Sequence, residues 1–162
     1  MGPLCVIPAR GGSKRLPRKN ILPLAGKPML AWTIEAARGS GVFDVIRVST
    51  EDAEVAEVAR AYGAEVHDRP AELAQDLSSS TEVCLELADA HPAHAALVCL
   101  QPPSPLMTAD DIRDAWGRYC AEDASYLVST TPIDPHYFHW AVHSEGGRWA
   151  PFFGDRFMRD RL

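Results

Sequence analysis

The 162-residue chain has few cysteines and no long apolar run, and each deficit excludes a class of protein. Its four cysteines show neither CxxC spacing nor histidine partners at metal-binding intervals, which argues against a structural zinc site. No apolar run approaches the ~20 residues of a membrane span, and no signal peptide precedes the first apolar run. We therefore expect a soluble, cytoplasmic protein with no membrane partner, and cysteines that pack in its interior.

Positive charge is also scarce, because the chain carries a formal net charge of -6. Proteins that coat nucleic acid present broad basic faces, so we expect no nucleic-acid partner. Against this background, the segment "PARGGSKRLPRKN" (residues 8–20) holds five of the sixteen Lys and Arg residues. Such a local concentration predicts a site for a small anion, although a solvated basic surface loop would give the same composition.

Two familiar phosphate-binding motifs are missing. The motif GxxxxGK[ST] does not occur, because Gly26-Lys27 is followed by Pro28, and GxGxxG is also absent. These absences argue against a P-loop and a dinucleotide-binding fold. The basic loop nevertheless contains the pair Gly11-Gly12, where a Cβ would keep an anion from approaching the backbone. Arg and Lys are the side chains that bind phosphate, so we predict a phosphate-binding loop of another kind.

Short apolar runs alternate with amphipathic stretches along most of the chain. We expect strands at residues 4–9, 44–50, 65–68, 95–102 and 125–133, and helices within residues 27–41, 49–64, 78–92 and 108–123. Strands of this kind, separated by helices, predict a three-layer α/β/α fold with a mostly parallel sheet. Such sheets bind ligands at the carboxyl ends of their strands, where the basic loop and the segment "QPPSPLMT" both lie.

Smaller signals set the ends of these elements. Ser49 or Thr50 is expected to cap the second helix, and Thr108 the fourth, because Ser and Thr are favoured at helix N-termini. The segment "HYFHWAVHSEGGRWAPFF" predicts a β-hairpin that turns at Gly146-Gly147.

The stretch "IPARGGSKRLPRKNILPLAGKPMLAWTIEAA" resembles the signature of the acylneuraminate cytidylyltransferases, ARxxSKxxxxKN followed by GxPL(I/M). This family comprises the CMP-sialic acid synthetases and their relatives for legionaminic and pseudaminic acids. The likeness continues through "VFDVIRVSTED", "YGAEVHDRPAELAQD" and "LQPPSPLMTADDI". It covers Leu4 to about Ile133, and the order of the motifs makes it specific.

The resemblance implies an enzyme that joins CTP to the anomeric hydroxyl of a 2-keto sugar acid and releases pyrophosphate. It also implies a Rossmann-like fold similar to that of the nucleotide-diphospho-sugar transferases, Mg2+ as cofactor, and a homodimer. We expect one nucleotidyltransferase domain over residues 1–162. Within it, residues 130–162 would form the hairpin and dimerisation region, and the exposed hairpin 137–153 would supply the contact.

The resemblance also implies roles for particular residues. The triphosphate is expected to bind Arg10, Gly11, Gly12, Ser13 and Lys14. Lys19 would stabilise charge at the α-phosphate, acting in catalysis with Arg10 and Lys14. Asn20 would contact the nucleotide's sugar, and Arg69, Ser78 and Ser80 would read cytosine. The sugar acid is expected to bind Gln101, Ser104, His139 and Arg159.

Simpler roles remain open for several of these residues. Arg69 could be a surface residue before a turn, residues 78–80 could only begin a helix, and Gln101 could only satisfy a strand end. His136 and His139 could pack in the interior. Arg15 and Arg18 are interpreted as solvated neighbours of the phosphate-binding residues.

The chain departs from the family in three respects. Pro103 stands where Thr is usual, and Met107 where Arg is common. The acidic pair that binds Mg2+ in the family has no counterpart, and Asp76, Asp110, Asp111 and Asp114 are better explained as turn and helix-start residues. Three interpretations follow: part of a longer cytidylyltransferase, a short enzyme for another acid such as Kdo, or a CTP-binding protein without catalysis.

Overall fold

The computed structural model describes residues 2–14, 16–75, 77–94, 96–122 and 124–131, together with the backbone of residues 142–145 and 148–151. These residues belong to two compact units, Met1–Leu127 and Val128–Leu162. No helix in the described ranges is long and apolar enough to cross a membrane.

The first unit contains a four-stranded sheet whose strand order is β5-β4-β1-β6. The strands are β1 (Leu4–Pro8), β4 (Val45–Thr50), β5 (Glu65–Asp68) and β6 (Leu97–Cys99). All three pairings are parallel, with Cys5 of β1 opposite Ile46 of β4 on one side and Val98 of β6 on the other. The predicted parallel sheet is therefore confirmed, and the carboxyl ends of its strands lie along one edge.

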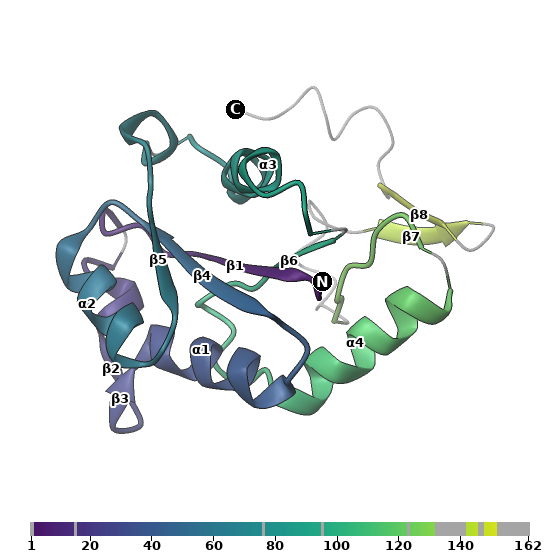
Figure 1. The fold of residues 1–162 in the computed structure, drawn as a ribbon, viewed down its shortest axis with the longest axis horizontal. Coiled ribbons are helices and arrows are strands. Elements are labelled where there is room, and N and C mark those ends of the chain that lie inside the picture. Colours follow the sequence, from purple (N-terminus) through teal and green to yellow (C-terminus); the bar gives the residue numbers. More distant parts are fainter. Residues whose placement is uncertain are drawn as a thin grey trace. The chain divides into compact units, whose positions relative to one another are not determined.

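Helices cover both faces of this sheet (Figure 1), which gives the predicted three layers. They are α1 (Met29–Ser40), α2 (Ala53–Ala61), α3 (Ser80–Ala90) and α4 (Ala109–Ala121). In β1, Leu4 and Val6 pack with Val83 and Leu87 of α3. Alternate side chains of a strand point to opposite faces, so Cys5 and Ile7 join the other core cluster, which contains residues of α1, α2 and α4.

Short elements between β1 and α3 were not expected from the sequence. The 3-10 helix η1 (Lys19–Ile21) closes the basic loop, and β2 (Pro23–Leu24) pairs antiparallel with β3 (Lys27–Pro28). A second 3-10 turn, η2 (Ala71–Leu73), lies between β5 and α3.

The helix caps agree with the sequence prediction at one of two positions. Thr108 caps α4 as predicted, and its hydroxyl accepts from the amide of Asp111 in a capping box. The prediction for α2 was wrong, because Asp52 is the N-cap and accepts from the amides of Glu54 and Val55. The strand β4 runs to Thr50, so Ser49 and Thr50 still have partners in the sheet.

The strand predicted at residues 125–133 is not formed over residues 125–131, and residues 132–133 lie outside the described ranges. Tyr126 is 67% exposed and Val128 64% exposed, so these apolar side chains are not buried as those of a core strand would be. The two strands of the predicted hairpin are present as β7 (Val142–Glu145) paired antiparallel with β8 (Arg148–Pro151), and its predicted turn at Gly146-Gly147 lies outside the described residues. The packing expected for the cysteines is right for buried Cys5 and wrong for exposed Cys99 and Cys120.

Candidate functional site

A cavity of about 160 Å³ lies where the carboxyl ends of the strands meet the start of α3. Its lining comes from segments that are far apart in the sequence: the end of β1 and the basic loop, the residue after β5, the N-terminus of α3, and the loop after β6. The lining residues are Pro8, Arg10, Ser13, Lys19, Asn20, Arg69, Ser78, Ser79, Ser80, Gln101 and Pro103. Most of the predicted site residues in the described ranges are therefore brought together.

The shape of the basic loop is fixed by Asn20, which is only 6% exposed. Its Nδ2 atom donates to the backbone carbonyl of Arg10 at 2.9 Å, so η1 holds the start of the loop in place. The Arg10 guanidinium donates to the carbonyl of Gln75 at 3.1 Å, which ties the loop to the segment after η2. If Asn20 contacts the sugar of a nucleotide, as predicted, the same side chain also has to keep its hydrogen bond to the loop.

The two glycines of the loop have different surroundings. A Cβ at Gly11 would lie 2.4 Å from Oδ2 and 2.6 Å from Cβ of Asp52, whereas a Cβ at Gly12 would meet nothing within 4 Å. The amide of Gly11 donates to Oε1 of Glu51 at 2.8 Å. A phosphate oxygen at this amide would compete with Glu51, a contact that sequence reasoning missed.

Arg18 connects the same loop to α2. It adopts a left-handed backbone conformation, with φ of 58°, and its guanidinium lies 3.3 Å from Asp52 and 2.6 Å from Glu54. The interpretation of Arg18 as a solvated neighbour agrees with its 40% exposed side chain, but it missed the two carboxylates that partner its charge. Arg15 lies outside the described residues. The basic loop is thus joined to the acidic start of α2 through Glu51 and Asp52 of the β4–α2 connection.

Arg69 directly follows β5 and is only 8% exposed, although it lines the cavity. Its Nε donates to the hydroxyl of Ser49 at 3.2 Å, and its Nη2 donates to the carbonyl of Ser49 at 2.7 Å. Burial lowers the pKa of the guanidinium, Glu51 opposes this change, and Arg10 adds to it. The alternative of a surface residue before a turn is therefore wrong for Arg69.

The serines predicted to read cytosine lie at the start of α3. Ser79 is the N-cap of this helix, and its hydroxyl accepts from the amide of Glu82 in a capping box. Ser78 donates to the carbonyl of Glu72 at 3.0 Å, while Ser78 and Ser80 both line the cavity. The role as a helix start is therefore confirmed for Ser79, whereas the reading of cytosine by Ser78 and Ser80 stays a prediction. The positive end of the helix dipole lies beside the cavity.

The predicted sugar-acid residues are only partly described. Gln101 lines the cavity and lies 3.4 Å from the thiol of Cys99, to which its Nε2 donates. Ser104 is exposed and is not part of that lining. His139 and Arg159 lie outside the described residues.

Lys14 lies beside the cavity, in an adjoining open hollow. The residues that line this hollow are Gly12, Ser13, Lys14, Ala74, Gln75 and Leu77.

The cavity is cationic. Arg10, Lys19 and Arg69 contribute to its lining, whereas no carboxylate does so among the residues that the structure describes. Serine hydroxyls and the amides of Asn20 and Gln101 supply neutral donors and acceptors. An arrangement of several cations with convergent neutral polar groups can bind a polyanion and read a polar ring next to it.

The described residues contain no magnesium site made of protein ligands alone, whereas Mg2+ usually binds through one or two carboxylates together with substrate phosphates. No group of three or more His, Cys, Asp or Glu side chains in these ranges could hold a metal ion. Asp111 belongs to the capping box of α4, and Asp110 pairs with Arg113, which agrees with their interpretation as helix-start residues. No step of the reaction is therefore assigned to a metal held by these side chains.

Comparison with known proteins adds to this geometry. The sequence model of the family described as "Cytidylyltransferase" matches residues 4–135. Pseudaminic acid cytidylyltransferase of Campylobacter jejuni is 38% identical over 81% of this chain and 59% of its own length. N-acylneuraminate cytidylyltransferase of Streptococcus agalactiae is 39% identical over 84% of this chain and 33% of its own length.

A solved structure is also similar. CMP:2-keto-3-deoxy-manno-octonic acid synthetase complexed with CTP superposes with a TM-score of 0.62 and 27% sequence identity, over 76% of this chain and 49% of that protein. The chain thus spans 59% or less of these proteins.

Proposed function

The chain belongs to the cytidylyltransferase family, and on that premise we propose that it binds CTP and transfers CMP to an acylneuraminate-type nonulosonic acid. The observation that carries the proposal is the cationic cavity at the carboxyl ends of the parallel strands. It combines Arg10 and Lys19 of the basic loop with buried Arg69 and the hydroxyls at the start of α3. Relatives named for pseudaminic acid and for N-acylneuraminate support this class of acceptor.

Binding of the nucleotide follows from the charges. A triphosphate needs several cations, and Arg10 and Lys19, with Lys14 in the adjoining hollow, would contact it from the basic loop. Ser13 lines both the cavity and the adjoining hollow, so it would bind the triphosphate where the two meet. Arg69 with Ser78 and Ser80 would read cytosine, which offers acceptors at O2 and N3 and a donor at N4.

The reaction would be an in-line displacement at the α-phosphorus. The anomeric hydroxyl of the acid gives its proton to solvent and forms a new bond to this phosphorus, while the bond from phosphorus to the bridging oxygen breaks and pyrophosphate leaves. Lys19 would face the charge that develops there, where preorganised cations lower the barrier most. Gln101 would hold the acid in the cavity. We expect Ser104, His139 and Arg159 to contribute as well.

Calorimetry and a transfer assay together test this proposal. We expect the chain to bind CTP, and to release pyrophosphate when Mg2+ and a nonulosonic acid are also present. Binding without pyrophosphate release from any acid would instead indicate a nucleotide-binding protein. An absence of CTP binding would contradict the proposal altogether.

Kdo is a second candidate acceptor, because the similar solved structure is that of CMP:2-keto-3-deoxy-manno-octonic acid synthetase. Its 27% identity is lower than that of the relatives named for nonulosonic acids, which is why we place it second. Transfer to Kdo, with none to neuraminate or pseudaminate in the same assay, would favour this alternative.

A further inference from the structure

Behind the cavity, three buried or half-buried side chains connect Arg69 to helix α3. The hydroxyl of Ser49, a residue that is 0% exposed, lies 3.2 Å from Nε of Arg69 and 3.0 Å from Nδ1 of His67. Nε2 of His67 in turn lies 3.2 Å from Oε2 of Glu86. Hydrogen bonds therefore join Arg69, Ser49 and His67, and Glu86 lies in close contact with His67; we call these four side chains the Arg69 support. It spans β4, β5 and α3.

The hydrogen-bond donors and acceptors of the Arg69 support are consistent with one arrangement. Arg69 can only donate, so the Ser49 oxygen accepts from its Nε. The Ser49 hydroxyl hydrogen is then available to His67, whose Nδ1 accepts it when the proton of the neutral ring is on Nε2. Nε2 then lies 3.2 Å from Oε2 of Glu86, a close contact that lacks the geometry of a hydrogen bond.

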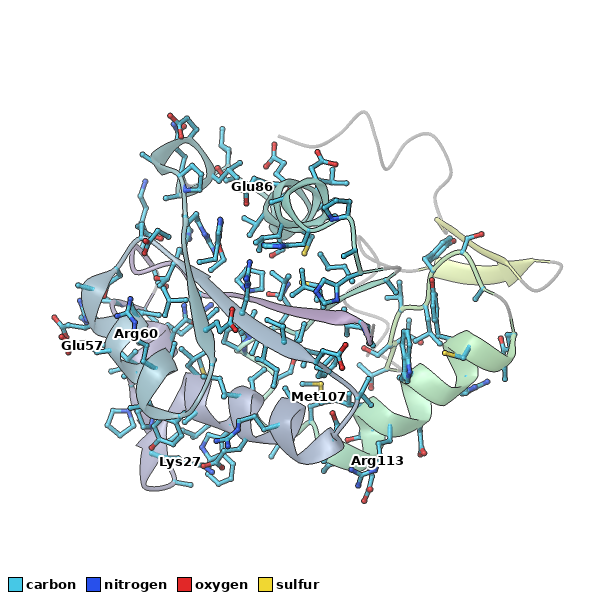
Figure 2. The ribbon with its side chains drawn as sticks, in the orientation of Figure 1. Lys27, Glu57, Arg60, Glu86, Met107 and Arg113 are labelled. Atoms are coloured by element: carbon cyan, nitrogen blue, oxygen red, sulfur yellow. The ribbon has the colours of Figure 1, made fainter. Side chains whose placement is uncertain are left out.

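Glu86 lies on α3 (Figure 2), and its carboxylate contacts His67 of β5. Its Oε2 atom is buried and has no hydrogen bond of good geometry within the described part of the chain, so the nearby His67 is the group that balances it. A buried carboxylate oxygen of this kind is costly without a partner, which favours keeping the His67 ring in place.

Neither His67 nor Glu86 lines the cavity, and Ser49 does not line it either. The support therefore acts on a ligand only through Arg69, whose guanidinium has two of its hydrogen bonds fixed by Ser49. A planar guanidinium that is held from behind presents its remaining N–H groups in one direction. Such preorganisation contributes most where discrimination depends on a directed hydrogen bond.

We propose that Ser49, His67 and Glu86 position Arg69 for reading the nucleotide base, and that they thereby determine the preference for cytosine over uracil. The inference rests on the proposed function, since it assumes that the cavity binds a pyrimidine nucleotide. Cytosine has an acceptor at N3, where uracil carries a hydrogen. A correctly directed Arg69 N–H is therefore satisfied by cytosine and repelled by uracil, whereas a guanidinium that is free to turn distinguishes them poorly.

The test is calorimetric titration of the 162-residue chain with CTP and with UTP, because binding can be measured whether or not the chain is catalytically active. His67→Leu removes the acceptor for Ser49, and we expect the ratio of CTP to UTP affinity to fall about tenfold, the size expected for one misdirected charged hydrogen bond. His67→Asn keeps an acceptor near the position of Nδ1, and it should restore most of the ratio.

Two further variants complete the design. His91→Ala removes another histidine, at the end of the same helix α3, whose contact is with Arg47 rather than with Arg69. It should leave the ratio unchanged. Ser49→Ala changes the volume little and should lower the ratio as His67→Leu does, so the test stands even if the leucine variant fails to fold.

The outcomes separate this inference from the proposed function. If the unmutated chain prefers CTP and both His67→Leu and Ser49→Ala keep that preference, the support does not position Arg69 and the inference is wrong, while the proposed function survives. If the unmutated chain binds no nucleotide, both fail together. A lower ratio in these two variants, restored by His67→Asn and unaffected by His91→Ala, supports the inference.

Discussion

Replacing Gly11 by alanine should destabilise the protein, because the new Cβ has no room. It would lie 2.6 Å from Cβ of Asp52 and 2.4 Å from its Oδ2. Contacts this short force a neighbour to move, and the neighbour here is the N-cap of α2. Asp52 would then lose its bonds to the amides of Glu54 and Val55, which are 2.9 and 3.0 Å long.

The expected size follows from two effects. Loss of a helix N-cap costs about 1 kcal/mol, and overpacking of a well-filled site costs about 1–3 kcal/mol. We therefore expect the free energy of unfolding to fall by about 2–4 kcal/mol. For a chain of this length, 1 kcal/mol corresponds to about 2–4 °C, so the unfolding temperature should fall by about 5–15 °C.

Thermal unfolding followed by circular dichroism measures this change, with Gly12→Ala as the matched control. A Cβ at Gly12 meets nothing within 4 Å, so this variant should stay within about 0.5 kcal/mol of the unmutated protein. Equal unfolding temperatures for the two variants would refute the argument from Asp52. If a phosphate approaches the backbone at Gly12, as we expect, Gly12→Ala should weaken CTP binding without this loss of stability.

Three other predictions follow from the same structure. Lys19→Ala should lower turnover far more than CTP affinity, because Lys19 is proposed to act on charge that develops during the reaction. An unchanged rate of pyrophosphate release in this variant would show that Lys19 has no part in the mechanism. Thr108→Ala should cost about 1 kcal/mol in chemical denaturation, since the cap of α4 is lost, and a cost near zero would contradict the importance of its capping box. Gel filtration should give a homodimer, a prediction from the family resemblance that a monomeric elution volume would oppose.

The sequence predicted the architecture well because the signals for it are local. Alternating apolar strands and amphipathic helices require a parallel sheet covered on both faces, and a parallel sheet brings its carboxyl ends to one edge. The basic loop after β1, Arg69 after β5 and Gln101 after β6 could therefore be expected near one another. The serines at residues 78–80 are typical of a helix N-terminus. A helix that follows a strand of a parallel sheet begins near the carboxyl end of that strand, so the start of α3 could also be expected there.

The predicted strand at residues 125–133 shows where local signals are insufficient. The segment "SYLVSTTPI" has the composition of a buried strand, but a strand also needs a partner for its backbone hydrogen bonds. The composition of a segment does not show whether a neighbouring strand is available to pair with it. Tyr126 and Val128 remain exposed in the structure instead of joining the sheet.

By itself, the sequence determined the layered fold, the position of a cationic loop at the ligand-binding edge, and the family to which the chain belongs. Only the tertiary structure decided how that loop is held: Glu51 binds the amide of Gly11, Asp52 occupies the space beside Gly11, and Arg18 pairs with Asp52. It alone placed His67 between Ser49 and Glu86, behind Arg69. These contacts join residues from different strands and helices, so they depend on distances between packed elements, and the order of residues along the chain does not encode such distances in any local pattern.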